Sequence, residues 1–259
     1  MTFPDLPRRV NVSLAAYPGL QCHEALDRIS LCPPSEPLLG TLGTDETQLC
    51  PQNRGVLTLD YVDMLREVYP NIRFRLHANV RVLPDRHVSD WSDWHPDSAY
   101  WRALATVSKR LDAPAYTAHA GRRSEADLPA LFENVRRAAD QFGCNVGIEG
   151  HFPTVQDAFL VSTWEEYRRL FESGVGYALD LSHLHILAEQ SRRWELALVQ
   201  EMLACERCLE VHLSGNDGCL DQHHMLVDVP WWWSAMGYIH DGATVFSEGK
   251  QRFPIQMQA

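Results

Sequence analysis

The residues best suited to do chemistry lie in the segment 210–224, which reads Glu-Val-His-Leu-Ser-Gly-Asn-Asp-Gly-Cys-Leu-Asp-Gln-His-His. His212 ends an apolar run, and Asp221 and His223 follow it, two residues apart. In extended backbone such a pair points to one side, so Asp-x-His presents a carboxylate and an imidazole together. These are ligands that borderline divalent metal ions accept. The segment therefore predicts a metal site.

Six further donors follow short apolar runs elsewhere in the chain: His77, His119, Glu149, Asp180, His183 and Glu248. Any one of them could instead be a hydrogen-bonded structural side chain. The full set of five imidazoles and four carboxylates is too large for one cation. It predicts two or three ions that share bridging carboxylates, with Glu149 as the bridge. We expect Glu149, Asp180 and His183 to be the catalytic residues.

The elements that must position these donors alternate between short apolar runs and longer amphipathic ones. We expect strands at 10–14, 73–82, 115–118, 145–148, 176–179, 209–213 and 244–246, and helices at 57–68, 98–111, 125–142, 164–173, 184–189, 194–204 and 229–236. The segment 32–54 reads as a long loop with a distorted strand at 38–42. This alternation predicts an α/β fold, a single (β/α)8 TIM barrel over residues 1–259. In such barrels the carboxyl ends of the strands converge on one site.

Composition narrows the function further. The net charge is −11, and the arginine pairs are dispersed, so the chain lacks the basic stripe that nucleic acid needs. No apolar run approaches the roughly 20 residues of a membrane span. The first nine residues lack the apolar segment of a secretory signal, so we expect a cytoplasmic protein with no membrane partner. The seven scattered cysteines suit reduced thiols. Nucleotide-binding and serine-hydrolase motifs are absent.

Candidate substrate-binding residues lie in the loops near the donors. Trp91 belongs to a loop at 85–97 that is long enough to act as a lid. Arg122 and Arg123 could bind a substrate carboxylate or simply be solvated, and Asn216 lies between the donors His212 and Asp221. Three histidines flank donor positions and could orient the ligands: His151, His185 and His224.

The order of the nine donors resembles that of the xylose-isomerase-like TIM barrels. The spacings Asp180-x-x-His183 and Asp221-x-His223 resemble endonuclease IV, a trinuclear zinc enzyme. The local sequence of the last third resembles that of the multinuclear non-haem iron-dependent oxidases (MNIO), in Val-His-Leu-Ser-Gly at 211–215 and Thr-Val-Phe-Ser-Glu at 244–248. Those oxidases usually carry Glu-Asn where this chain has Glu149-Gly150, and often Asn where Asp180 and His183 stand.

The resemblance to the oxidases implies an enzyme that holds two or three iron ions and uses dioxygen to modify a cysteine or thiol of a peptide substrate. Such peptides are ribosomally made precursors of natural products, and a separate partner protein could deliver them. Two alternatives stay open. One is a zinc- or manganese-dependent phosphodiesterase of the endonuclease IV type, which the charge disfavours. The other is a divalent-metal sugar isomerase or epimerase, for which nine donors are more than needed.

Overall fold

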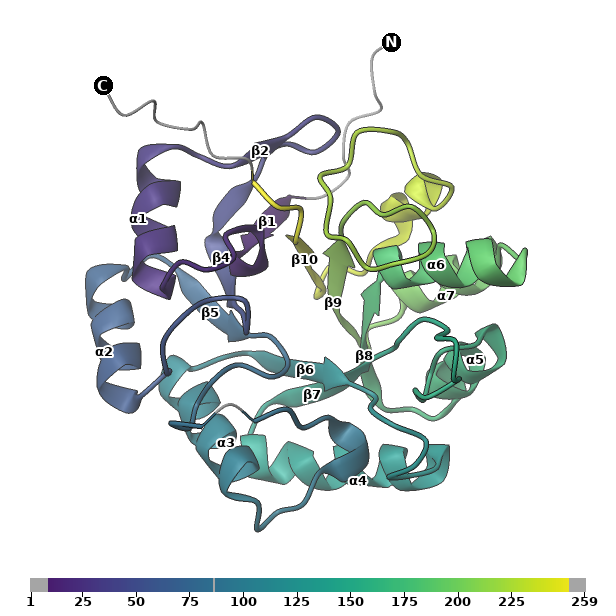
Figure 1. Cartoon of the computed structure of the whole chain (residues 1–259), viewed down its shortest axis with the longest axis horizontal. Helices are drawn as coiled ribbons and strands as arrows, with labels where there is room; N and C mark the ends of the chain where they lie inside the picture. The colour runs from purple at the N-terminus through teal and green to yellow at the C-terminus, as the bar shows by residue number, and fades with distance from the viewer. Residues whose placement is uncertain (1–8, 86, 252–259) are drawn as a thin grey trace.

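Eight parallel strands form the centre of the computed structural model, which describes residues 9–85 and 87–251 (Figure 1). Along the sheet they follow the order β5-β4-β1-β10-β9-β8-β7-β6. Their bounds are β1 Val10–Ser13, β4 Gly43–Leu49, β5 Arg73–Leu76, β6 Ala115–His119, β7 Asn145–Glu149, β8 Gly176–Asp180, β9 Cys208–Leu213 and β10 Thr244–Ser247. The end strands β5 and β6 contact each other without a hydrogen-bonded ladder in the described part of the chain, so the barrel is nearly closed.

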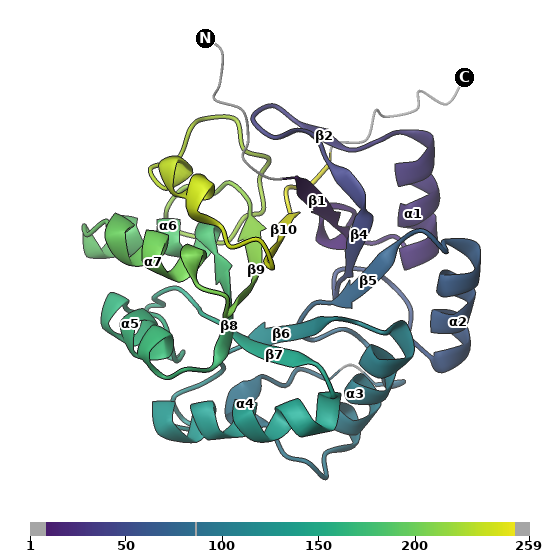
Figure 2. The same ribbon diagram turned by 180° about the vertical axis from the view of Figure 1, so that it is seen from behind.

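Helices surround this sheet on the outside (Figures 1 and 2). They are α1 Cys22–Leu31, α2 Leu59–Val68, α3 Ala99–Leu111, α4 Leu128–Phe142, α5 Trp164–Glu172, α6 Leu181–Ser191 and α7 Leu196–Ala204. Three short 3-10 helices are η1 Leu14–Ala16, η2 Trp91–Asp93 and η3 Trp233–Tyr238, and a small antiparallel hairpin pairs β2 Ser35–Glu36 with β3 Gly40–Thr41. The arrangement is the (β/α)8 TIM barrel that the sequence predicts.

Local sequence explains where the helices begin and end. The Asp127 side chain accepts a hydrogen bond from the Ala130 backbone amide, and Gly143 ends α4 in the left-handed conformation with φ 68°. Asp180 caps α6 in the same way, because its Oδ1 accepts from the amides of Ser182 (2.7 Å) and His183 (3.2 Å). Since one oxygen of Asp180 is used in this way, the other is left for the site.

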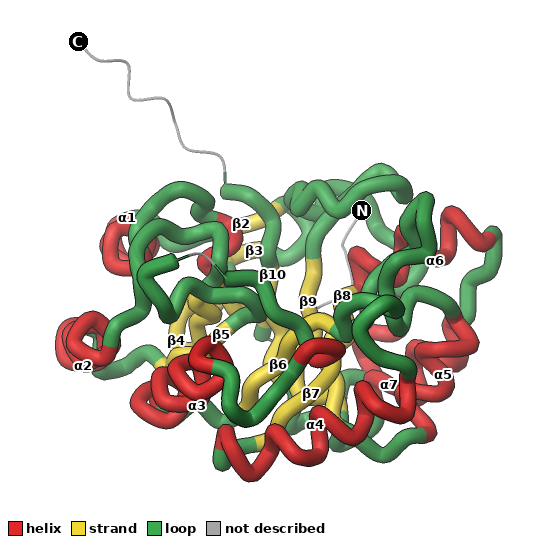
Figure 3. The backbone as a smooth tube through the Cα atoms, turned by 60° about the horizontal axis from the view of Figure 1, so that its bottom comes forward, coloured by secondary structure: helices red, strands yellow, loops and turns green. Residues whose placement is uncertain are grey.

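Strand register brings the donors to one level. His119 pairs with Glu149 across β6 and β7, and Asp180 pairs with His212 across β8 and β9. Side chains alternate between the helices and the barrel interior, so Glu210 lies one step below His212 on the inner face. Figure 3 shows the loops, in green, gathered over one end of the strands.

The errors of the sequence prediction lie in the first third of the chain and at residues 229–236. The strand expected at 38–42 is the small hairpin, and the real second strand is β4 at Gly43–Leu49. Helix α1 was not expected. The strand expected at 73–82 ends at Leu76, and the helix expected at 229–236 is the 3-10 helix η3. The other expected strands and helices are confirmed within a few residues at each end.

The predicted domain spans residues 1–259, and both of its ends lie outside the described residues. Most of the N-terminal segment that was considered for a secretory signal also lies outside them. Of the helices in the described ranges, none combines the length and the apolar content needed to cross a membrane.

Candidate metal centre

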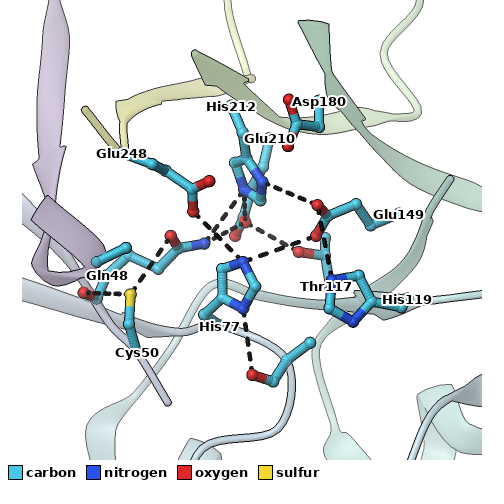
Figure 4. Close-up of polar contacts among 12 residues, drawn as sticks. Gln48, Cys50, His77, Thr117, His119, Glu149, Asp180, Glu210, His212 and Glu248 are labelled. Carbon is cyan, nitrogen blue, oxygen red and sulfur yellow. Dashed lines mark hydrogen bonds and ion pairs between the residues drawn. The ribbon is translucent and has the colours of Figure 1, made fainter. Parts of the chain in front are cut away.

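Five of the nine predicted donors meet at the barrel mouth, where β5, β6, β7, β9 and β10 end. Figure 4 shows His77, Glu149, His212 and Glu248 pointing toward one another, with His119 beside Glu149. His77 Nε2 lies 3.3 Å from Glu248 Oε1 and 3.9 Å from Glu149 Oε2. Glu149 Oε1 lies 3.4 Å from His212 Nδ1 and 4.0 Å from His119 Nε2. All except the half-buried His119 are buried.

The other four donors form the adjoining side of the same mouth. His183 Nε2 lies 3.3 Å from Asp180 Oδ2 and 3.7 Å from Asp221 Oδ2. His223 Nε2 lies 2.8 Å from Asp221 Oδ2, and its Nδ1 lies 3.8 Å from Glu248 Oε2. The last distance joins this group to the first five donors.

Three sets of three donors have ligand atoms within 4.8 Å of one another. They are His77, His119 and Glu149; His77, His212 and Glu248; and Glu149, Asp180 and His183. Glu149 and His77 each belong to two sets. The structure therefore brings all nine predicted donors into one connected cluster, in which Glu149 has the position expected of a bridging carboxylate.

The imidazoles His77 and His183 are held with one nitrogen turned toward the other donors. His77 Nδ1 lies 3.1 Å from the Ala78 carbonyl oxygen, and His183 Nδ1 lies 2.9 Å from the Gly150 carbonyl oxygen. A carbonyl only accepts, so each Nδ1 carries the proton and each Nε2 offers its lone pair to the cluster. This arrangement is typical of histidines that bind metal ions.

His212 is oriented by a buried carboxylate that the sequence analysis did not identify. Glu210 Oε2 lies 3.2 Å from His212 Nε2 and also accepts from Gln48 Nε2 at 3.1 Å. Glu210 is held in turn by Arg75 at 3.1 Å and Thr117 at 2.9 Å. His212 Nε2 therefore donates to Glu210, and Nδ1 faces Glu149. The signal in the sequence was the spacing of two residues, which puts Glu210 and His212 on one face of β9.

Asp90 orients His119 in the same way, and the sequence analysis did not identify it either. Its Oδ1 lies 3.4 Å from His119 Nδ1 and accepts from Asn79 Nδ2 at 3.0 Å. Burial would raise the pKa of Asp90, but His119 and His151 outweigh it and lower that pKa. His151 stacks on His119 with ring centroids 5.0 Å apart, and burial lowers its pKa to about 3, so its ring is neutral.

Buried polar atoms that lack a hydrogen-bond partner indicate whether a metal ion would fit the cluster. Glu149 Oε2, Glu248 Oε1 and His212 Nδ1 are buried and lack a hydrogen-bond partner. A buried polar atom without a partner costs roughly 1–3 kcal/mol, and more when it is charged. A divalent cation among these atoms would satisfy all three, and imidazole with carboxylate suits zinc, manganese or iron. The residues present therefore fit a metal ion.

Without a cation the cluster balances its charge with protons. Burial would raise the pKa of Glu149, but His212 and His119 outweigh it and hold that pKa well below its usual range. Burial would lower the pKa of His183, but Asp180 and Asp221 raise it to about 10. Burial raises the pKa of Asp180 itself to about 6. Metal ions would replace the protons on these histidines, so binding should release protons.

The predicted substrate-binding residues have other roles in the structure. Trp91 is fully buried, stacks on Trp101 with centroids 4.9 Å apart, and donates to the Gly147 carbonyl at 2.8 Å. It therefore belongs to the core and does not face the mouth, which corrects the prediction. Its burial follows from the aromatic side chains of the neighbouring helices, which the loop packs against.

Arg122, Arg123 and Asn216 also contact other residues of the protein. Arg123 donates to Glu166 at 2.9 Å, so its guanidinium is not free to bind a substrate carboxylate. Arg122 is exposed and lies over the Phe159 ring at 5.3 Å. Asn216 donates to the Ser182 carbonyl at 2.9 Å and accepts from the Gly218 amide at 2.8 Å, so it shapes the donor loop. A substrate contact by Arg122 stays a prediction.

Comparisons with known proteins agree with this geometry at the level of the fold. No family model and no curated protein matches the sequence. A D-tagatose 3-epimerase-like protein matches with a TM-score of 0.64 and 14% identity, over 95% of this chain and 92% of that one. The 3-keto-D-glucoside 4-epimerase YcjR from E. coli matches with a TM-score of 0.61 and 10% identity, over 95% and 94%.

A family 2 AP endonuclease from Brucella melitensis matches with a TM-score of 0.57 and 17% identity, over 95% of this chain and 94% of that one. At these identities the similarity is one of fold. The structural neighbours are xylose-isomerase-like and AP-endonuclease-like barrels, and the narrower resemblance to the iron oxidases finds no counterpart among these three matches. The chain therefore has the xylose-isomerase-like fold, with a possible metal centre at its mouth.

Proposed function

We propose that this protein is a divalent-metal-dependent isomerase or epimerase of a small polyhydroxylated carbonyl compound, such as a sugar. The observation that carries the proposal is the pair of buried carboxylates that flank His77. Glu149 and Glu248 approach its Nε2 from different strands, at 3.9 Å and 3.3 Å, and each keeps one oxygen without a hydrogen-bond partner.

Two carboxylates facing one space suit the transfer of a proton between carbon atoms. Isomerisation of a hydroxy carbonyl compound removes a proton from the carbon next to the carbonyl group and returns one to a different position or face. Glu149 Oε2 can accept the proton, and Glu248 Oε1, after it has taken a proton from solvent, can return that proton to the substrate from the other side. A bound divalent cation would supply a Lewis acid that polarises the neighbouring substrate oxygen. His183 and His212, each held by a hydrogen bond at one ring nitrogen, would orient substrate hydroxyl groups or the cation with the other.

The charge of the cluster favours an uncharged substrate. In the described ranges, every ion pair of the nine donors is with another donor, with Asp90 or with Glu210, and none is with lysine or arginine. Among the described residues, no lysine or arginine is paired with the donors to bind the charge of a phosphodiester; Lys250 Nζ lies 3.0 Å from the Gln222 carbonyl oxygen at the rim of the donor loop. This disfavours the phosphodiesterase alternative, and the epimerases among the structural neighbours support the isomerase.

The second candidate is a multinuclear iron oxidase that acts on a cysteine or thiol of a peptide, delivered by a partner protein. The observation in its favour is the overlap of three donor sets, which offers more ligands than an isomerase needs. The two candidates differ in the metal they require and in their need for dioxygen, so one set of assays separates them.

The decisive assay measures exchange of carbon-bound hydrogen. We would load the protein with Mn²⁺, Co²⁺ or Zn²⁺ under nitrogen, incubate it in D2O with a panel of ketoses and aldoses, and record proton NMR spectra. We expect metal-dependent incorporation of deuterium next to the carbonyl carbon of at least one sugar. Glu149→Gln and Glu248→Gln should each lower this rate by a hundredfold or more, roughly the contribution of a general base.

The matched control is Glu133→Gln, because Glu133 lies on α4 with 59% of its side chain exposed and should leave the rate unchanged. Absence of exchange with every sugar and metal, together with oxygen consumption by the iron-loaded protein and a cysteine-containing peptide, would replace the isomerase by the oxidase. Cleavage of a phosphodiester by the zinc-loaded protein would instead establish the hydrolase.

A further inference from the structure

A cavity of about 400 Å³ lies outside the donor cluster. One wall is the outer face of α6, with His185 and Glu189, and the other is the loop at 214–232 that follows β9. In Figures 1 and 2 this loop lies beside α6. None of the nine donors lines the cavity. The proposed isomerase chemistry therefore leaves it unexplained.

The donor loop separates this cavity from the metal centre. Gly215 and His224 pair across the loop, with backbone hydrogen bonds of 2.7 and 2.8 Å, and both line the cavity. The donors Asp221 and His223 lie within the loop that this pair closes. His223 faces Glu248, whereas its neighbour His224 faces the cavity. One loop thus forms a wall of both sites.

Three residues of the lining carry buried polar atoms without a hydrogen-bond partner. They are His185 Nδ1, Ser214 Oγ and Trp231 Nε1. Ser214 is only 3% exposed, so bulk water does not satisfy its hydroxyl group. Buried polar groups in native proteins nearly always have a partner, and each exception needs an explanation, of which a bound molecule is one. Together these atoms offer a hydroxyl group, an indole N–H and an imidazole nitrogen.

The charge and the aromatic groups of the lining identify the kind of molecule. Glu189 and Asp228 bring two carboxylates, and no lysine or arginine is among the described lining residues. Arg192, outside the lining, donates to Glu189 Oε2 at 3.0 Å, so Oε1 is the oxygen that remains for a ligand. Trp194, 47% exposed, stands at its edge, and Trp231 belongs to its wall. Tryptophan faces attract organic cations, and carboxylates bind ammonium groups. Burial lowers the pKa of His185, so its ring is neutral and can accept a hydrogen bond from such a group.

We propose that this cavity binds a small organic ammonium ion that has an apolar or aromatic body and one oxygen acceptor. The ammonium group binds near Glu189 and Ser214, the apolar body lies against Trp194, and the oxygen accepts from Trp231 Nε1. The volume suits a ligand of this size, since pockets for small molecules begin at roughly 300 Å³. The binding site is separate from the metal centre and goes beyond the proposed isomerase activity.

The test uses three probes that share a phenylpropane body and differ in charge: phenylalaninol, 3-phenylpropane-1,2-diol and 3-phenyllactate. Isothermal titration at pH 7 should show that phenylalaninol binds, that the neutral diol binds at least roughly tenfold more weakly, and that the anion binds more weakly still. In a ¹H–¹⁵N spectrum, the indole signal of Trp231, assigned with Trp231→Phe, should shift on addition of phenylalaninol.

Variants locate the binding. Glu189→Gln should weaken phenylalaninol roughly tenfold, whereas Glu133→Gln, exposed on α4, should leave it unchanged. Glu149→Gln, in the metal centre, should also leave it unchanged. Equal affinity for the three probes, tightest binding of phenyllactate, or an unaltered affinity in Glu189→Gln would overturn the proposal. Loss of binding in Glu149→Gln would place the amine at the metal centre and overturn it too.

Discussion

A histidine becomes a firm metal ligand when an acceptor fixes one ring nitrogen as a donor and leaves the other free. Backbone carbonyls do this for His77 and His183, and carboxylates do it for His119 and His212. The carboxylate partners add negative charge close to the imidazole and make its free nitrogen a better ligand. Asp90 and Glu210 therefore contribute to metal affinity without touching the ion.

Asp90→Asn tests this contribution. The change keeps the size of the side chain but removes the charge that faces His119 Nδ1 at 3.4 Å. We expect metal affinity to fall by about ten- to a hundredfold, as for other partners of ligating histidines, while the protein stays folded. Competition with a fluorescent chelator would measure the dissociation constant, and circular dichroism would check the fold.

The control for that substitution is Asp97→Asn. Asp97 belongs to the same loop, and 82% of its side chain is exposed. Its replacement should leave the dissociation constant within twofold of the parent protein. Equal affinity of Asp90→Asn and the parent protein would show that His119 needs no carboxylate, or that it does not bind the metal.

The donors could be predicted from the sequence because each follows an apolar strand, and strand ends converge in this fold. Glu210 and Asp90 could not, for different physical reasons. The spacing of two residues places Glu210 on the same face as His212, but it does not show that Glu210 contacts the His212 ring, because that position depends on Arg75 and Thr117 from other strands. Asp90 lies in a loop, and its distance from His119 depends on how residues 77–98 fold back, which local spacing does not encode.

At the scale of secondary-structure elements, one aromatic side chain fixes the loop that follows β5. Trp91 is fully buried against Trp101 and Phe142, so it fixes η2 to the helices α3 and α4. The same loop carries Asp90, one residue earlier. Packing of Trp91 therefore sets the position of a carboxylate that orients His119.

Trp91→Ala should accordingly lower the free energy of unfolding by about 3–5 kcal/mol, the usual loss for a large buried aromatic side chain. Urea denaturation would measure it. Trp194→Ala serves as the comparison, because Trp194 is 47% exposed and should lose about 1 kcal/mol or less. Similar stability of the two variants would contradict a core role for Trp91.

The loop after β6 is tied to α5 by an ion pair between Arg123 and Glu166, and this pair predicts a pH dependence. Burial would raise the pKa of Glu166, but Arg123 and the Ser162 amide outweigh it and lower that pKa. A carboxyl group with a lowered folded-state pKa contributes stability above its unfolded pKa, and loses it as the pH falls through the folded value. Glu166→Gln should therefore cost about 1–2 kcal/mol at pH 7, and progressively less below about pH 4.

Glu165→Gln is the matched control, since Glu165 is the adjacent residue with 66% of its side chain exposed, and should change stability by about 0.5 kcal/mol or less. Urea denaturation at pH 7 and at pH 3.5 would compare both variants with the parent protein. A loss for Glu166→Gln that is the same at the two pH values would contradict an ionic origin.

Amphipathic helices and apolar strands of the last two thirds were predictable, because their periodicity reports which face is buried. Strand β4, Gly-Thr-Asp-Glu-Thr-Gln-Leu, was missed because its inner face carries Glu46 and Gln48 in place of apolar residues. Arg75, which pairs with Glu46, comes from the neighbouring strand β5, whereas Glu210, which accepts from Gln48, comes from the distant strand β9. Closure of the barrel is what brings Glu210 to these polar positions. Helix α1 did carry a helical pattern, with Cys22, Ala25, Leu26 and Ile29 buried.

At the scale of the whole molecule, the barrel interior is unusual in its charge. Barrels of this kind are commonly filled with layers of branched apolar side chains. Here a polar layer with Arg75, Glu210 and Gln48 lies beneath the nine donors, and four donor carboxylates share one small space. The apolar contacts between sheet and helices must hold the fold together, whereas the mouth gathers carboxylates whose charge protonated histidines balance and metal ions can balance in their place.

Metal ions should therefore stabilise the whole protein by binding the folded state alone. At a free metal concentration one hundred times the dissociation constant, one site adds about 2.7 kcal/mol, and further sites add more. We expect the melting temperature to rise in steps as Mn²⁺ or Zn²⁺ is titrated into metal-free protein, and to fall again with a chelator. Glu149→Gln, which alters two of the three donor sets, should lose most of this rise. An equal rise in Glu149→Gln and the parent protein would place the stabilising ions somewhere other than the barrel mouth.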